Sequence, residues 1–127
     1  MNTNLVERDG HRLLVADASG PLIGRAQDAL DLITLAWEQD ATIVVVPVER
    51  FVPEFFRLRS LLAGEFIGKF ANYRAKLAIL GDISDKTAES DSLRDFVREC
   101  NRGTSIFFLP DLEALIAKLT ALAGRIG

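Results

Sequence analysis

The second half of the chain alternates between continuous apolar runs and amphipathic stretches. From Tyr73 to Leu119 it reads AKLAILGD, SLRDFVREC, the turn NRG, TSIFFLP and a helical run. Two buried strands joined by one amphipathic helix form a right-handed βαβ unit, which requires a parallel sheet covered by helices. The pattern therefore predicts an α/β fold.

The first half supplies the remaining strands and two helices. Strand-like runs on either side of Asp9-Gly10 predict a β-hairpin over residues 4–17. Apolar residues at three- and four-residue spacing predict a helix over 23–38. The β-branched run 42–46 is typical of a central strand buried on both faces. A second amphipathic helix is predicted over 58–73.

The predicted order is β-β-α-β-α-β-α-β-α in one domain, residues 1–127. We expect a four- or five-stranded mixed sheet with parallel strands at its centre and four helices. The polar run 82–91 predicts a mobile loop, and residues 121–127 predict a mobile tail.

Composition limits the partners and the cellular compartment that we expect for this domain. The hydrophobic fraction of 49% indicates either a sheet covered on both faces or a surface buried against a partner. A net charge of -3 argues against a nucleic-acid binder. A single cysteine, Cys100, points to a reducing compartment. With no secretory leader and no apolar run near ~18 residues, we expect a cytoplasmic protein without a membrane span.

Small residues recur every four positions along the second predicted helix, at Ser60, Gly64, Gly68 and Asn72. Each glycine inside a helix costs ~1 kcal/mol relative to alanine, so close approach of a neighbour should offset it. That neighbour is either the protein's own sheet or the same helix of a second subunit in a two-fold dimer. Both alternatives stay open, and the second makes this row a self-association surface.

Ligands of open parallel sheets bind beyond the carboxyl ends of the strands. Polar side chains gather at these ends, and the candidate ligand-binding set is Glu49, Arg50, Asp82 and Ser84. Carboxylates with a serine could form an acid–base pair or a cation site, but acidic residues at strand ends are also ordinary turn formers. We name no metal ligand and no cofactor.

The sequence contains few residues that could carry out nucleophilic catalysis. His11 is the only histidine, and it follows the hairpin turn. Cys100 would become reactive only if it were exposed and if Arg98 and Arg102 lowered its pKa. Those arginines continue a stripe from Arg94, which is either a solvated face or a docking surface for an acidic partner. The sequence provides no catalytic residue, so we expect a protein that is not an enzyme.

The stretches LAGEFIGKFANYRAKLAILGD and SLRDFVRECNRGTSIFFLPDLEALIAKL resemble a small bacterial family known as domain of unknown function 4180. The resemblance covers about residues 4–119, and the family has no established activity that would imply catalytic residues. Its pattern maps onto Gly64, Glu65, Asn72, Tyr73, Arg74, Gly81, Asp82, Asn101, Arg102 and Gly103.

The order of strands and helices also resembles the sulfate-transporter and anti-sigma-factor-antagonist (STAS) fold. Signalling members of that fold carry a phosphorylated serine after the central strand, where this chain reads PVERF. A related branch has apolar pockets, which here could be lined by Phe51, Phe55, Phe56 and Trp37, although the same residues suit an ordinary core.

Three functions are compatible with these patterns. The first is a non-enzymatic regulatory or protein-binding module that self-associates as a homodimer or binds another protein. The second is a binder of a small apolar or anionic ligand at the strand ends. The third is an enzyme that uses Asp82, Glu49 or neighbouring carboxylates, which requires two of these groups in one cleft.

Overall fold

The computed structural model describes residues 2–124 and contains one five-stranded sheet, with the strands arranged in the order of the sequence. β1 is antiparallel to β2, and β2 to β5 are parallel neighbours. The mixed sheet with parallel central strands is therefore confirmed, at the larger of the two predicted sizes. The strands are β1 Thr3–Arg8, β2 His11–Ala16, β3 Ile43–Pro47, β4 Leu77–Leu80 and β5 Ile106–Leu109.

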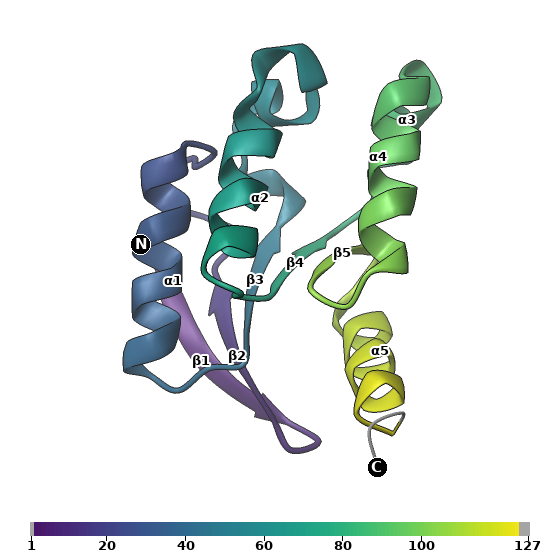
Figure 1. Cartoon of the computed structure of the whole chain (residues 1–127). Helices are drawn as coiled ribbons and strands as arrows, with labels where there is room; N and C mark the ends of the chain where they lie inside the picture. The colour runs from purple at the N-terminus through teal and green to yellow at the C-terminus, as the bar shows by residue number, and fades with distance from the viewer. Residues whose placement is uncertain (1, 125–127) are drawn as a thin grey trace.

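The helices cover both faces of this sheet (Figure 1). Because each new parallel strand is added on the same side, right-handed crossovers place α1, α2 and α4 on one face. α5 follows the last strand and packs on the opposite face. The helices are α1 Ala26–Glu38, α2 Leu62–Asn72, α3 Ser84–Glu89, α4 Asp91–Arg102 and α5 Leu112–Gly124.

The alternation of side chains along β3 separates two apolar layers. Val44 and Val46 point toward α1 and α2, whereas Ile43 and Val45 point toward α5. All four are buried, so the β-branched run is a central strand covered on both faces, as predicted. The layer under α2 is rich in aromatic rings, which belong to Phe51, Phe55, Phe56, Phe66 and Phe70.

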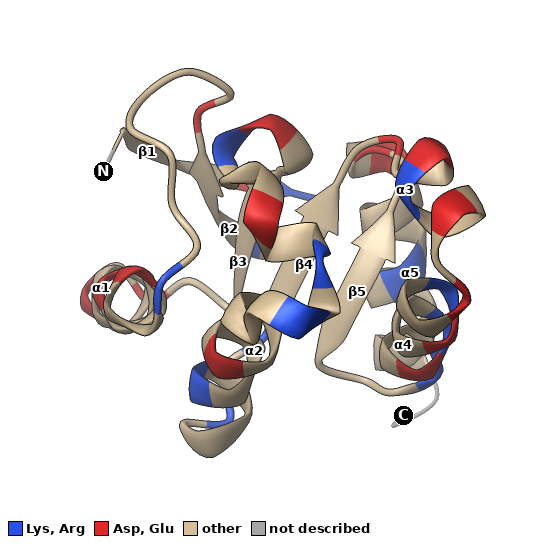
Figure 2. Ribbon diagram, turned by 90° about the horizontal axis from the view of Figure 1, so that it is seen from above, with Lys and Arg blue, Asp and Glu red and all other residues tan. Residues whose placement is uncertain are grey.

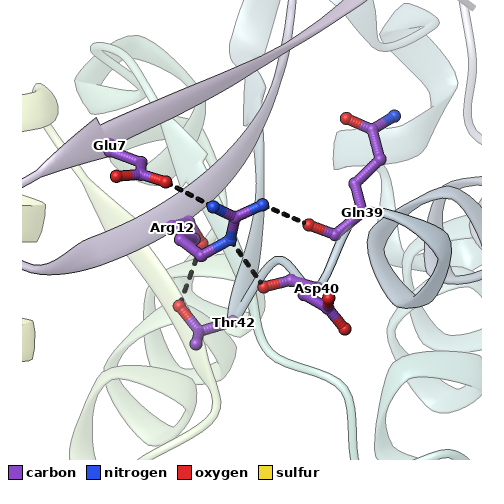
Figure 3. A network of polar contacts seen from close by, with 5 residues as sticks. All are labelled: Glu7, Arg12, Gln39, Asp40 and Thr42. Atoms are coloured by element: carbon purple, nitrogen blue, oxygen red, sulfur yellow. Dashed lines mark hydrogen bonds and ion pairs between the residues drawn. The ribbon is translucent and has the colours of Figure 1, made fainter.

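The predicted hairpin is confirmed, with Arg8 opposite His11 and Asp9-Gly10 in the turn. Both turn residues have positive φ, 50° and 83°, as a two-residue hairpin turn of the primed type requires. Arg12 then joins the hairpin to the end of α1 (Figure 3). Its guanidinium pairs with Glu7 and donates to the carbonyl oxygens of Gln39 and Asp40, at 2.7 and 3.1 Å, so it caps the last turn of α1.

The second predicted helix begins later than its apolar row indicated. Residues Leu58–Ser60 form a short 3₁₀ turn, and α2 starts at Leu62. Leu61 between them has a φ of 66°, which interrupts the helix. The Ser60 hydroxyl donates to the carbonyl of Glu54 at 2.7 Å and accepts from the N–H of Leu62 at 3.2 Å. Ser60 therefore closes the entry to α2 instead of extending its row.

Two other local predictions differ from the structure. The run 82–91, predicted as a mobile loop, contains the short helix α3 and the start of α4, which Ser90 caps by accepting from the N–H of Leu93. Trp37 belongs to the predicted apolar row of α1, but 55% of its surface is exposed. Of the predicted tail, residues 121–124 form the end of α5, and residues 125–127 lie outside the described part of the chain.

Candidate functional site

The carboxyl ends of β3, β4 and β5 lie side by side at one end of the sheet, which faces the viewer in Figure 2. Gly81 follows β4 with a φ of 143°. A Cβ at this position would lie 2.8 Å from Cγ2 of Val48, so only glycine allows the loops after β3 and β4 to approach so closely. The close approach brings the polar residues after both strands to one place.

Asp82 lies between two cavities at the carboxyl ends of the strands. The larger cavity, about 640 Å³, also contains Ser84 and is bounded by α4 and the end of β5. The smaller one, about 450 Å³, contains Glu49 and Lys86 beside Phe51 and Phe56. The structure thus brings Asp82 together with Glu49 on one side and with Ser84 on the other.

Arg50, the fourth member of the predicted ligand set, points away from both cavities. Only 1% of its surface is exposed. Its guanidinium donates to the main-chain carbonyls of Asp17, Ser19 and Pro21, at 2.8, 3.3 and 3.1 Å. The structure therefore gives Arg50 a role in holding the loop after β2, at a distance from the side chains that line the cavities.

The Asp82 carboxylate is held by its neighbour Ser84. The Ser84 hydroxyl and main-chain N–H, the latter at 2.8 Å from Oδ1, lower the pKa of Asp82, and Lys86 adds a smaller effect in the same direction. A lowered pKa means that the ionised carboxylate is favoured in the folded state. Any stability it brings is present above the ordinary carboxyl pKa and is lost as the pH falls through the lowered value.

We expect Ser84→Ala to raise the pKa of Asp82 part of the way to its ordinary value, because the hydroxyl is lost while the main-chain N–H stays. A carbon-detected NMR titration of the Asp82 carboxyl group measures this shift. Ser92→Ala, an exposed serine on α4, is the control and should leave the titration unchanged. An unaltered Asp82 pKa in the Ser84 variant would show that the hydroxyl does not hold the carboxylate.

Sequence reasoning missed the contribution of α4 to the larger cavity, which is lined by Arg94, Arg98 and Arg102. The signal was their four-residue spacing, which places them on one side of a helix. Each arginine is also paired with an acid three residues earlier, and the partners are Asp91, Asp95 and Glu99. Figure 2 accordingly shows α4 carrying both signs of charge. The cavity therefore has an arginine rim whose charge is partly compensated on the solvent side.

The apolar pocket considered for the phenylalanines and Trp37 is not formed. Phe51 and Phe55 stack with ring centroids 4.0 Å apart, and Phe66 packs edge-on against both. Trp37 lies elsewhere, at the end of α1, where the centroid of its ring is 5.6 Å from that of Tyr73. The phenylalanines pack in the core, where Phe51 and Phe56 also border the smaller cavity, and Trp37 belongs to the surface.

Cys100 is half-buried on α4, and burial raises the pKa of its thiol, with Glu99 adding to the rise. The lowering by neighbouring arginines that exposure would have allowed does not occur. Within residues 2–124, no group of three or more His, Cys, Asp or Glu side chains is placed to hold a metal ion. No helix among the described residues is long and apolar enough to cross a membrane.

The glycines of α2 do not pack on the protein's own sheet. The buried side of α2 consists of Ala63, Phe66, Ile67 and Phe70. A Cβ built at Gly64 or at Gly68 would meet no atom of the described chain within 4 Å. The first explanation of the small-residue row is therefore wrong, because these glycines face open space.

The structure defines a small α/β domain with four parallel strands. Polar residues lie at the carboxyl ends of these strands, and two glycines of α2 face open space. A family model, domain of unknown function 4180, matches residues 8–119. The chain belongs to this family, as its motifs indicated. No curated protein and no solved structure matches the chain.

Proposed function

We propose that the protein is a non-enzymatic regulatory or protein-binding module that self-associates through the outer face of α2. The observation that carries this proposal is the open space around Gly64 and Gly68. Two glycines in a helix of 11 residues cost ~2 kcal/mol together relative to alanines, and nothing in the described chain uses the room they leave. A second helix could use it, because glycine lets two backbones approach closely.

Exposed apolar side chains lie at both ends of this row. Leu61, directly before α2, is 64% exposed, and Tyr73, directly after it, is 49% exposed and contacts the exposed Trp37. Together with Gly64, Gly68 and Asn72 these residues form what we call the α2 face. Its centre has no charge and little side-chain bulk, while aromatic residues of the kind enriched at protein interfaces lie at one end.

Helix packing around a two-fold axis suits this face. A two-fold contact uses the same patch on both copies, so the patch must fit itself. A row of small residues does so, since the glycines of one copy leave room for the helix of the other. Glu65 and Lys69 lie beside the row with opposite charges, so that two antiparallel copies could place unlike charges opposite each other.

Gly68→Leu should abolish the contact through the α2 face, so that the assembly becomes smaller, and leave the fold intact, because the new side chain enters open space in the single chain. Native mass spectrometry measures the assembly, and circular dichroism checks the fold. Ala117→Leu, which introduces the same side chain at an exposed position of α5 on the other face of the sheet, should change neither. A Gly68 variant with the assembly of the wild type would contradict the proposal.

A second candidate function is the binding of a small apolar or anionic ligand in the larger cavity. It is supported by an apolar floor that includes Val97, Phe108 and Pro110 under the arginines of α4. Asp82 and Ser84 would contact such a ligand at the strand ends, whereas Glu49 lines only the smaller cavity and Arg50 lines neither. The same native spectra of wild-type protein report this function, as added mass that disappears under denaturing conditions.

A further inference from the structure

The two outer edges of the sheet differ in whether their main-chain groups are used. β5 directs the carbonyls of Ser105 and Leu109 toward β4, so Phe108 between them faces outward. Asn101 meets it there: the Asn101 amide donates to the Phe108 carbonyl at 3.0 Å and accepts from the Phe108 N–H at 2.7 Å. Pro110, which has no N–H, follows the strand. The β5 edge is therefore closed to another strand.

The β1 edge is open. Arg8 and His11 close the hairpin, and the alternation of antiparallel pairs makes Asn4, Val6 and Arg8 the residues bonded to β2. The main-chain N–H of Thr42 donates to Arg12, which confirms that β2 turns its even-numbered residues toward β3. In β1 the outward-facing residues are consequently Thr3, Leu5 and Glu7. No hydrogen bond from elsewhere in residues 2–124 reaches their main-chain groups.

Unpaired edges are normally kept from pairing by free charges or by proline. β1 contains no proline, and its two charged residues are already engaged within the chain. Glu7 pairs with Arg12 (Figure 3), and Arg8 pairs with Glu113 on α5 at 3.1 Å. At the middle of the edge Leu5 is 37% exposed. β1 therefore has neither proline nor a free charge to prevent strand pairing, and the centre of its edge is apolar.

We propose that β1 pairs with β1 of a second copy, antiparallel and centred on Leu5. In this register Leu5 faces Leu5, and Thr3 faces Glu7 of the second copy. All three outward residues then form hydrogen-bonded pairs, and no like charges lie opposite each other. The contact continues the sheet across two copies, and it is isologous, because Thr3 of each copy faces Glu7 of the other and the same patch serves on both.

Other registers use this edge less well. A pairing centred on Glu7 would place two carboxylates opposite each other, which is destabilising. A pairing centred on Thr3 would leave Leu5 and Glu7 without a partner residue in β1 of the second copy, because β1 begins at Thr3. The centre at Leu5 is the register in which backbone pairing, apolar contact and charge agree.

This contact goes beyond the proposed function, because it rests on the sheet edge and is independent of the α2 face. A chain with two different isologous contacts builds assemblies larger than a dimer. If both contacts form, Leu5→Lys and Gly68→Leu will each leave a dimer, and the double variant will be a monomer in native mass spectrometry. The failure of either contact can therefore be distinguished from the failure of the other.

Leu5→Lys is the first test, because it places two ammonium groups opposite each other across the axis while altering an exposed position of the single chain. We expect loss of the β1 contact and unchanged circular dichroism. Leu5→Val, which keeps an apolar β-former, is the matched control and should keep the assembly. A Leu5→Lys protein with the same assembly as wild type would overturn the proposal, whatever Gly68→Leu does.

Disulfide trapping tests the register itself. In a Cys100→Ser background, Leu5→Cys would place two thiols on residues whose Cα atoms lie about 5.5 Å apart, a separation that a disulfide spans. Thr3→Cys, on the same strand and the same face, would place its two thiols four residues out of register, about 13 Å apart. We expect oxidation to cross-link the Leu5 variant at least about tenfold faster than the Thr3 variant. Equal rates, or faster cross-linking of the Thr3 variant, would overturn the Leu5-centred contact.

Discussion

Replacing Arg50 with alanine should lower the free energy of unfolding by about 3–5 kcal/mol. The guanidinium is buried and donates to carbonyls of Asp17, Ser19 and Pro21. Removing it leaves these acceptors without their donor, and each such loss costs up to about 1–3 kcal/mol before relaxation. The loop that connects β2 to α1 would lose its side-chain attachment to the segment after β3, and the main-chain bridge between Ile23 and Phe51 would remain.

Lysine at this position should recover only part of the loss. An ammonium group is a point donor, whereas the guanidinium presents Nε and Nη1 in a fixed plane that matches several carbonyls at once. Gly20 contributes to this fit, because a Cβ there would lie 3.1 Å from Cζ of Arg50. The measurement is urea denaturation followed by circular dichroism, with the exposed Arg59→Ala as a control expected within about 0.5 kcal/mol of wild type. A loss below about 1 kcal/mol in Arg50→Ala would contradict this account.

Phe66→Ala should cost about 3–5 kcal/mol, which is the range for removing a buried phenylalanine from a packed core. Phe66 is fully buried and its ring touches three others, those of Phe51, Phe55 and Phe70, at centroid distances of 5.4 to 5.5 Å. The substitution therefore removes a large apolar area and leaves a cavity between α2 and the irregular segment after β3.

Phe66→Leu is the matched variant for this prediction. It keeps most of the volume while losing the ring contacts, so we expect a markedly smaller loss than for alanine. Both variants are compared with wild type by denaturant unfolding, with the slope of the transition checked for two-state behaviour. Equal losses in the two variants would show that ring contacts, and not volume, dominate at this position.

Local chemistry was sufficient to predict most of the elements. Asp9-Gly10 marked the hairpin because only a few residues tolerate positive φ at both turn positions. The run around Val44 marked a central strand because both of its faces are apolar. In both cases the residues that determine the structure are adjacent in the chain, so their pattern alone predicts the element.

Other features depended on distant groups that periodicity does not describe. The apolar row of α1 is broader than one buried face needs, so its pattern did not reveal that Trp37 lies outside. Arg50 was expected beside a ligand, but the three carbonyls that hold it come from a loop about thirty residues earlier. The break at Leu61 required the Ser60 hydroxyl to reach back to Glu54. In the candidate site, Glu49, Asp82 and Ser84 were found from their positions after strands, whereas the arginines of α4 required knowledge of how that helix lies.

The sequential order of the strands has a consequence for how the chain folds. Every strand pairs with the strand that precedes it in the sequence, so none has to be inserted between two that are already paired. Contacts of this kind join segments that are close along the chain, which favours rapid folding. During synthesis the sheet can grow by one strand at a time from the hairpin outward, and Asn101 emerges just before β5, ready to close the growing end.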